Sequence, residues 1–439
     1  MSTGAFYIHT FGCQMNVHDS EQMAQILCEA GYVKTSEADR ADIIIINTCS
    51  VREKAAQKVY SHLGRLKKLK QKNPGLIMGV AGCLAQEQGA GFFRKAPCLD
   101  LVIGTHNIHR LVKAIEEIKD RRSQIVDTSF HRSVRSLGIR TLPAPGSVSA
   151  FVTIMQGCNN FCSYCIVPYV RGREESRQSA DIIEEISFLA KNGIREVTLL
   201  GQNVNSYGTT LPGDIDFPVL LGMINGVDGI DRIRFTTSHP KDLSGDLVAC
   251  FDDLDKVCEH IHLPVQSGSD YVLKKMKRGY TLGEYLEKVG MLRDASPDIS
   301  ITSDMIVGFP GEKESDFQKT IDLMKKVRFD NTFSFRYCDR HGTASEGYDG
   351  KVEETVKQER LSRLQSLQER HSLEKNRYLE GRVEDVLVEG VSKNDDADVT
   401  GRTRGNKIVN FAGDTDLIGK TVRVKIVRAH IHSLRGEVL

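Results

Sequence analysis

The 439-residue sequence contains no tryptophan, only 11 prolines and no long apolar run. A membrane-spanning helix needs about 20 consecutive apolar residues, whereas the longest apolar stretch here, "DIIIINTC" from Asp42, has the length of a buried strand. The first residues, "MSTGAFYIHTFGC", lack the basic and apolar regions of a secretory signal. These absences predict a cytoplasmic protein without membrane segments.

The chain also lacks an excess of either charge, because 59 lysines and arginines balance 58 aspartates and glutamates. Any surface that binds nucleic acid must therefore be local. The candidate is the terminal stretch "GKTVRVKIVRAHIHSLRGEVL", in which Glu437 is the only acidic residue. Alternation along "KTVRVKIVR" directs basic side chains to one surface of a strand. We expect RNA phosphates to contact Arg423, Lys425 and Arg428.

Eleven cysteines stand out against this ordinary composition. Thiols stay reduced in the cytoplasm, where clustered cysteines more often bind metals or act in catalysis than form disulfides. Cys158, Cys162 and Cys165 lie within eight residues in a C-x3-C-x2-C pattern. One short loop can therefore wrap three thiolates around a compact centre.

Several identities for that centre are compatible with the pattern. Structural zinc takes four ligands, and no fourth cysteine or histidine lies nearby. The common ferredoxin run is C-x2-C-x2-C, which differs in spacing. Three thiolates would leave one iron of a 4Fe–4S cubane open, and the amine and carboxylate of an amino acid can chelate that iron. A chance grouping of reduced cysteines is the remaining alternative.

The N-terminal residues repeat one pattern three times. The apolar runs "AFYIHTFGC", "DIIIINTC" and "LIMGVAGC" end at Cys13, Cys49 and Cys83, which are 36 and 34 residues apart, and a helix-compatible stretch follows each run. Alternating strands and helices predict a Rossmann-like parallel sheet, whose carboxyl edge is where such sheets bind ligands. Each cysteine alone is more often a core residue, but their shared position favours a second three-cysteine site.

The rest of the chain indicates two further folds. Six strand candidates, from "SAFVTIMQ" to "NTFSFRYC", alternate with helical stretches and predict an open (β/α)6 barrel, three-quarters of a TIM barrel. Short alternating runs beyond Gly381 predict a small all-β barrel. The predicted α/β architecture thus has an N-terminal domain (1–122), a linker (123–147), a central domain (148–372) and a terminal barrel (373–439).

The C-x3-C-x2-C motif at the end of a first barrel strand resembles that of the radical S-adenosylmethionine enzymes. The N-terminal cysteine triad and the terminal barrel, of the TRAM type, resemble the methylthiotransferases within that group. The tRNA-modifying members are the most similar in several phrases: "TFGCQMN", "GCNNFCSYCIVPYVRGREESR", "LLGQNVNSYG", "RFTTSHP", "VLVEGVSK" and "GRTRGNKIVNF". One departure is "FRYCDRHGTAS", where Cys338 replaces an expected serine.

The resemblance implies addition of a methylthio group to carbon 2 of N(6)-isopentenyl adenosine, next to the tRNA anticodon. It implies two 4Fe–4S clusters, one on each cysteine triad, and two molecules of S-adenosylmethionine per turnover. It also implies a tRNA anticodon stem-loop as substrate, an electron donor such as flavodoxin or ferredoxin, and a donor of iron–sulfur or sulfur. We expect a monomer.

By analogy with the same fold, polar residues near the ends of the central strands are expected to seat S-adenosylmethionine; they are Gln202, Asn203, Ser238, Gln266, Ser267 and Asp304. The alternative is that they satisfy backbone groups at strand ends. Arg171, Arg173 and Arg177 either contact phosphate or a cofactor carboxylate, or form a solvated run of charge.

Two other functions were weighed against tRNA modification. A ribosomal-protein side chain as substrate would suit an acidic or neutral terminal barrel, and the basic strands disfavour it. An iron–sulfur electron carrier would gain nothing from an open iron or from a second three-thiolate site. The sequence therefore favours a tRNA methylthiotransferase.

Overall fold

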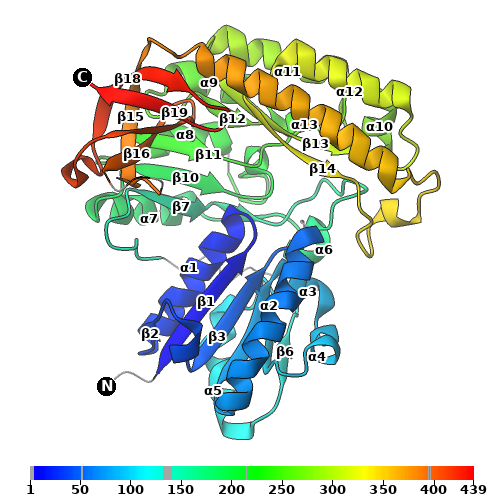
Figure 1. Ribbon diagram of the computed structural model, residues 1–439, viewed down its shortest axis with the longest axis vertical. Coiled ribbons are helices and arrows are strands. Elements are labelled where there is room, and N and C mark those ends of the chain that lie inside the picture. The colour runs from blue at the N-terminus through cyan, green and yellow to red at the C-terminus, as the bar shows by residue number, and fades with distance from the viewer. Residues whose placement is uncertain (1–3, 51–52, 132–140, 214, 394, 396) are drawn as a thin grey trace. The chain divides into compact units, whose positions relative to one another are not determined.

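The computed structural model describes residues 4–50, 53–131, 141–213, 215–393, 395 and 397–439 (Figure 1). The chain divides into two compact units. The first comprises Met1–Leu142, Thr153–Asn159 and Ile166–Arg177, and the second comprises Pro143–Val152, Asn160–Cys165 and Gln178–Leu439. No helix within the described ranges has both the length and the apolar character needed to cross a membrane.

The first unit contains a six-stranded parallel sheet in the order β2-β1-β3-β4-β5-β6. The strands are β1 (Ala5–Phe11), β2 (Val33–Lys34), β3 (Ile43–Thr48), β4 (Ile77–Gly82), β5 (Leu101–Ile103) and β6 (Ile125–Asp127). The parallel sheet predicted from the three apolar runs is confirmed in β1, β3 and β4. The two short edge strands were not predicted, and β6 lies inside the expected linker; the rest of that linker includes residues 132–140, which are outside the described ranges.

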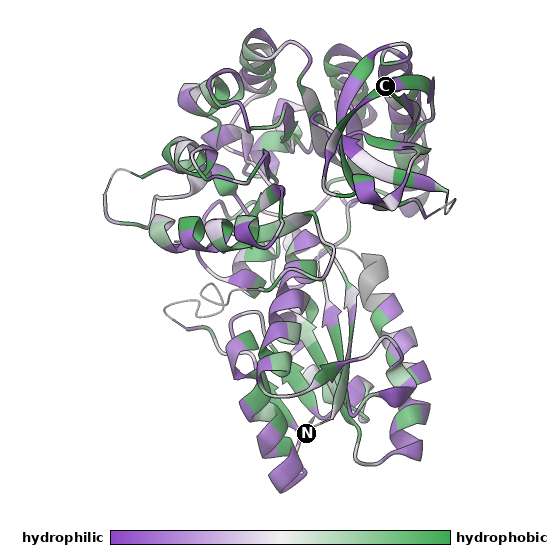
Figure 2. Ribbon diagram, turned by 90° about the vertical axis from the view of Figure 1, so that its left-hand side faces the viewer, coloured by the Kyte–Doolittle hydropathy of each residue, from purple (hydrophilic) through white to green (hydrophobic). Residues whose placement is uncertain are grey.

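Helices cover both faces of this sheet, so its inner strands are buried on both sides (Figure 2). Ile43 and Ile45 face one core, which α1 (Gln14–Glu29) and α5 (Leu111–Arg121) complete. Ile44 and Ile46 face the other, which residues of α2, α3 and α4 complete. This explains the continuous isoleucine run, because a strand buried on both faces needs no polar alternation. The helices of the second face are α2 (Glu53–Lys72), α3 (Cys83–Gln88) and α4 (Gly91–Lys95).

Three short elements of the first unit flank the C-x3-C-x2-C segment: β8 (Met155–Gln156), α6 (Val167–Arg171) and β9 (Glu175–Ser176). The strands β8 and β9 pair antiparallel, with Met155 opposite Ser176. Within the described residues of this unit, the single-turn 3-10 helices are η1 (Ala38–Arg40) and η2 (Ile108–Arg110).

The second unit contains all six predicted central strands in two three-stranded sheets, β11-β10-β7 and β12-β13-β14. A bridge from Ile233 to Val257 links β11 to the residues before β12, so the six strands follow one another in an open barrel. Their bounds are β7 (Ser149–Thr153), β10 (Glu196–Leu200), β11 (Arg232–Phe235), β12 (His260–His262), β13 (Ser300–Val307) and β14 (Asn331–Arg336).

Helices connect these strands, and several begin at side-chain caps. Thr281 and Glu284 form a reciprocal capping box at the start of α11, which satisfies two otherwise unpaired backbone N–H groups. The helices are α7 (Ser179–Lys191), α8 (Phe217–Asn225), α9 (Gly245–Asp253), α10 (Asp270–Lys275), α11 (Leu282–Ala295), α12 (Glu314–Val327) and α13 (Glu354–Arg377), with η4 (Val204–Ser206), η5 (Pro240–Asp242), η6 (Ala344–Gly347) and η7 (Thr415–Leu417). The long charged helix α13 packs on β14 and runs through residue 372, where a domain boundary was expected.

The terminal barrel is closed, in the strand order β15-β16-β17-β19-β18. Its members are β15 (Val383–Val391), β16 (Asp398–Thr403), β17 (Ile408–Ala412), β18 (Thr421–Ala429) and β19 (Leu434–Val438). Small and branched apolar side chains fill its centre, with Phe411 as the one buried aromatic in that cluster. The predicted small all-β barrel is confirmed.

Two buried arginines of β11 attach this barrel to the central strands. Arg232 donates to the carbonyl oxygens of Arg402 at 2.6 Å and Asp385 at 2.9 Å. Arg234 donates to the carbonyl oxygens of Arg404 and Thr403, both at 2.7 Å. These contacts satisfy charged donors that would otherwise be costly to bury.

Candidate functional site

The three N-terminal cysteines come together at the carboxyl edge of the first sheet. Cys13 precedes α1, Cys49 directly follows β3, and Cys83 begins α3 directly after β4. The strands end in register, with Phe11 opposite Thr48 and Thr48 opposite Gly82. A hydrogen bond with Cys49 lowers the pKa of the Cys13 thiol to about 6.

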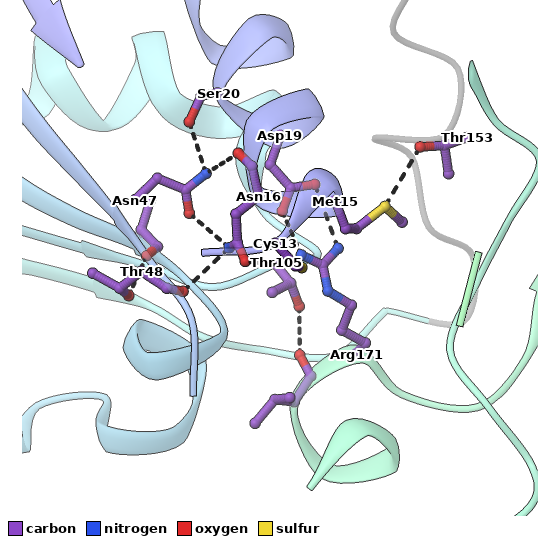
Figure 3. Close-up of polar contacts among 12 residues, drawn as sticks. Cys13, Met15, Asn16, Asp19, Ser20, Asn47, Thr48, Thr105, Thr153 and Arg171 are labelled. Atoms are coloured by element: carbon purple, nitrogen blue, oxygen red, sulfur yellow. Dashed lines mark hydrogen bonds and ion pairs between the residues drawn. The ribbon is translucent and has the colours of Figure 1, made fainter. Parts of the chain in front are cut away.

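Two asparagines hold the loops of this edge together (Figure 3). The Asn16 side-chain amide donates to Asn47 Oδ1 at 3.1 Å and to the Thr48 carbonyl oxygen at 3.2 Å. The Asn47 amide donates in return to the Asn16 carbonyl oxygen at 2.7 Å. Gly82 has φ +89°, and a Cβ there would lie 2.3 Å from Asn47 Oδ1. The residue before Cys83 must therefore be glycine.

Cys49 and Cys83 are buried, whereas Cys13 is exposed. Burial raises the pKa of the Cys83 thiol, and the positive charge of Arg171 acts in the opposite direction. The site is thus open on the side of one cysteine and closed around the other two. Such an arrangement suits a ligand that is held by the protein and also reached from outside.

Arg171 and Asp19 form a buried ion pair beside these thiols, with 2.5 Å between Nη2 and Oδ2 (Figure 3). Their side chains are 3% and 5% exposed. Burial alone would lower the pKa of Arg171, but Asp19 and the neighbouring thiols Cys83 and Cys13 raise it well above its ordinary value. The guanidinium therefore stays charged next to the cysteines.

The donor set fits an iron–sulfur cluster better than a single ion. Among the described residues, no group of three or more histidine, cysteine or carboxylate side chains is arranged around one metal ion. A cubane cluster takes one thiolate on each of several corner irons, so its ligands stand farther apart than those of one ion. Three converging thiols with a nearby positive charge are suited to hold such a group.

The residues around Cys158 are ordered by close backbone contacts in the first unit. The Cys158 N–H donates to the Gly172 carbonyl oxygen at 3.2 Å. Gly157 has φ +81°, and a Cβ there would lie 2.0 Å from the Arg173 carbonyl oxygen. The glycine before the first cysteine of the motif is therefore required by this close approach.

In the second unit, Cys162 lies beside one guanidinium, that of Arg278, and one imidazole, that of His239. Its Sγ is 3.4 Å from Arg278 Nη1 and 4.0 Å from His239 Nε2. Burial lowers the pKa of His239 to about 2, so this imidazole is neutral. The Cys165 N–H donates to the Cys162 carbonyl oxygen at 2.9 Å, which tightens the end of the motif.

Arg278 is fixed at this position by four acceptors. Besides Cys162, it donates to the Pro264 carbonyl oxygen at 2.7 Å, to the Tyr280 hydroxyl at 3.0 Å and to the Tyr164 hydroxyl at 3.4 Å. Sequence reasoning missed Arg278, because it stands in the basic run "KKMKRGY" just after α10, which indicates an exposed helix end. Tyr164 itself packs against the apolar cluster of Phe309 and Tyr337.

Three of the residues expected to bind S-adenosylmethionine lie just after strands: Gln202 and Asn203 follow β10, and Ser238 follows β11. Gln202 is half-buried and Asn203 is buried; the Asn203 amide donates to Asp242 Oδ2 at 2.7 Å. The Ser238 hydroxyl and Asn203 Oδ1 are buried without a hydrogen-bond partner within the described part of the chain. Unsatisfied buried polar atoms are uncommon, and these two are available to a bound ligand.

The residues expected after β12 and on β13 differ in their contacts. Gln266 has φ +75°, and its N–H donates to the Asp304 carbonyl oxygen at 2.9 Å. The Asp304 carboxylate is 3.5 Å from His262 Nε2. The Ser267 hydroxyl is fully buried and accepts from the Ser269 N–H at 3.2 Å, which matches the alternative of a strand-end cap.

The "VRGREESR" arginines are not a uniformly solvated run. Arg173 is exposed, whereas Arg171 and Arg177 are buried. Arg177 Nη1 donates to the Thr153 carbonyl oxygen at 2.9 Å. The alternative of a solvated charge run therefore fails for two of the three residues.

The terminal barrel exposes Arg423, Lys425 and Arg428 on β18. Lys425 pairs with Glu437, and after a register shift Arg428 pairs with Arg435. Because Arg435 and Glu437 are two residues apart, they share a face of β19. The bulge therefore returns Arg428 to the face of Lys425, from which strict alternation would have removed it.

Family models match three stretches of the chain: the uncharacterized protein family UPF0004 at residues 5–104, the radical SAM superfamily at 152–324 and the TRAM domain at 377–439. Among solved structures, the chain resembles the radical S-adenosylmethionine methyltransferase TsrM from Kitasatospora setae with cobalamin and a 4Fe–4S cluster bound. The TM-score is 0.56, with 14% identity over 79% of this chain and 74% of that one. That likeness establishes the fold alone.

Curated relatives match over nearly the full length. The chain is 60% identical to the tRNA-2-methylthio-N(6)-dimethylallyladenosine synthase of Syntrophus aciditrophicus, over 99% of this chain and 94% of the relative. It is 52% identical to the protein of the same name from Geobacter sulfurreducens, over 99% and 97%. The chain therefore belongs to the tRNA-2-methylthio-N(6)-dimethylallyladenosine synthases, within the radical S-adenosylmethionine superfamily.

Proposed function

We infer that this protein adds a methylthio group to carbon 2 of N(6)-isopentenyl adenosine at position 37 of tRNA. The observation that carries this inference is the convergence of Cys13, Cys49 and Cys83 at one sheet edge, in a chain that has a second cysteine triad in its radical SAM region. A carrier of electrons needs no such second site. The sequence identity to the named synthases supports the same substrate.

The chemistry requires a radical, because an aromatic C–H bond is not ionised by any protein acid or base near neutral pH. When bound, 4Fe–4S clusters supply the electron that cleaves S-adenosylmethionine and a place to hold sulfur. Cys158, Cys162 and Cys165 would hold the first cluster, and Cys13, Cys49 and Cys83 the second. The protein's part is to bind these groups and align the substrate with them.

Polar groups near the carboxyl ends of the central strands would seat S-adenosylmethionine. Ser238 Oγ and Asn203 Oδ1 are buried and without partners in the described chain, so they have hydrogen-bonding capacity left for a ligand. Gln266 follows β12 and bridges to Met305, the residue after Asp304 on β13, and Gln202 is half-buried beside Asn203. Ser267 would act indirectly, by shaping the turn after β12.

The partners follow from the reaction. An electron donor such as flavodoxin or ferredoxin would reduce the protein, and an iron–sulfur or sulfur donor would restore the consumed sulfur. The protein would act as a monomer in the cytoplasm, where tRNA is modified and thiols stay reduced. The anticodon stem-loop would present an unstacked base to the site.

Nucleoside analysis of cellular tRNA tests the proposed reaction. In a strain that lacks this gene, 2-methylthio-N(6)-isopentenyladenosine should disappear and N(6)-isopentenyladenosine should accumulate in its place, as measured by liquid chromatography and mass spectrometry. The wild-type gene should restore the methylthiolated nucleoside. An unchanged nucleoside profile in the deletion strain would overturn the proposed function.

Neutralising the basic face of β18 should weaken tRNA binding in a salt-dependent manner. Substitution of Arg423, Lys425 and Arg428 by glutamine should reduce the slope of log affinity against log salt by roughly one unit per lost phosphate contact. Fluorescence anisotropy with a labelled anticodon stem-loop at several salt concentrations measures this slope. Lys393→Gln, an exposed change in the same barrel but outside β18, is the control. An unchanged slope in the triple variant would contradict the assignment.

A further inference from the structure

The C-x3-C-x2-C segment continues into an arginine that lies among the N-terminal cysteines. Arg171 ends α6, six residues after Cys165 in the sequence. Within the first unit its guanidinium is buried with Asp19, at 2.5 Å between Nη2 and Oδ2 and 3.4 Å between Nη1 and Oδ1. One continuous stretch of chain thus carries three cysteines of one triad and a charged residue of the other.

The guanidinium of Arg171 lies next to the N-terminal thiols. Cys83 belongs to one buried cluster with Ile166 and Val170, and Val170 directly precedes Arg171. Figure 3 shows Cys13 beside the Arg171–Asp19 pair. A group held by these cysteines would therefore lie close to a buried positive charge.

Anchoring the segment does not require this charge. The backbone of α6 is already held by the Thr105 hydroxyl, which donates to the Val170 carbonyl oxygen at 2.6 Å, and by His106 Nε2, 3.0 Å from the Arg171 carbonyl oxygen. A buried ion pair contributes little net stability compared with apolar side chains of similar volume. The charge of Arg171 therefore has a possible use other than stability, toward a group that the neighbouring cysteines hold.

We propose that Arg171 is a positioning residue that sets the reduction potential of the cluster held by Cys13, Cys49 and Cys83, with Asp19 as the opposing charge. A cluster with thiolate ligands is anionic, and both hydrogen bonds to its sulfurs and nearby positive charge favour the reduced form. The guanidinium supplies the positive charge. This inference rests on the proposed function, in particular on the assignment of the second cluster to these three cysteines.

The test uses the full-length protein with Cys158, Cys162 and Cys165 replaced by alanine, so that a single cluster remains. After anaerobic reconstitution, its potential is measured by a redox titration followed by electron paramagnetic resonance. Asp19→Asn removes only the negative charge and should raise the potential. Adding Arg171→Gln to that variant leaves no unpaired buried charge and should lower the potential below that of Asp19→Asn alone.

Each change should alter the ratio of reduced to oxidised cluster, at a fixed applied potential, by roughly tenfold or more, as expected for one charge a few ångströms away in a partly screened interior. Asp100→Asn is the matched control: Asp100 pairs with Lys70 at 2.6 Å and precedes β5 at the opposite edge of the same sheet. That variant should leave the potential unchanged.

The possible outcomes separate the two claims. A potential that rises with Asp19→Asn and falls again when Arg171→Gln is added supports the role of Arg171. Equal potentials in folded, iron-loaded variants would overturn it and leave the cluster assignment standing. A parent protein that binds no iron would overturn both, because Cys13, Cys49 and Cys83 would then hold no cluster.

Discussion

Cys49→Ala should abolish methylthiolation of tRNA while S-adenosylmethionine is still cleaved when the protein is reduced. The reason is that the proposed function gives the two triads different work: Cys158, Cys162 and Cys165 would serve cleavage, whereas Cys13, Cys49 and Cys83 would hold sulfur. Cys49 is the triad member that is 1% exposed and hydrogen-bonds Cys13. Mass spectrometry would measure 5′-deoxyadenosine and the methylthiolated nucleoside in the same reaction.

Wild-type protein should also hold a methyl group that acid releases as methanethiol before any reductant is added, and Cys49→Ala should not. If Cys49 were only a core residue, its truncation would cost about 1–2 kcal/mol of unfolding free energy and leave product formation intact. Cys98→Ala is the control, because Cys98 is a half-buried cysteine of the same domain that precedes β5 rather than following a strand. Methylthiolated nucleoside from folded Cys49→Ala protein would end the sulfur-carrying assignment.

Removal of the C-x3-C-x2-C thiols should abolish cleavage of S-adenosylmethionine, which Cys49→Ala should retain. A protein with Cys158, Cys162 and Cys165 replaced by alanine should retain roughly four of about eight irons, as two cubanes predict, and form no 5′-deoxyadenosine. Iron and sulfide analysis after anaerobic reconstitution measures the first quantity, and mass spectrometry the second.

The matched control for that variant changes the same number of cysteines outside both triads. Replacing Cys250, Cys258 and Cys338 by alanine should leave the iron content at the wild-type level. Iron that is absent from the C-x3-C-x2-C variant, or present at the wild-type amount, would contradict two independently held clusters.

The sequence predicted the sheet strands well because burial and chain direction are local signals. The isoleucine run of β3 and the apolar run of β4 could only belong to a sheet covered on both faces, and parallel strands necessarily end at one edge. This is why the sequence alone predicts that Cys13, Cys49 and Cys83 lie together. The strands β2 and β6 were missed because two or three residues give no measurable periodicity.

The charged partners of the cysteines could not be predicted in the same way. Asp19 lies 152 residues from Arg171, and neither residue stands in a pattern that indicates burial. Arg278 is part of a basic run that normally covers a helix end. Long-range pairing of charged side chains depends on tertiary packing, so only the structure reveals it. The bulge that turns Arg428 was hidden for the same reason, because it depends on the pairing with β19.

Arg232 and Arg234 make the terminal barrel an inseparable part of the second unit rather than an exchangeable module. Both side chains are buried against backbone carbonyl groups of the barrel, and Arg234 also pairs with buried Glu196 at 2.9 Å. A chain that stopped after α13 would leave these guanidinium groups without most of their acceptors. Loss of the barrel by truncation or recombination would thus damage the central strands themselves, so evolution can vary the exposed surface of this barrel more readily than it can discard the barrel.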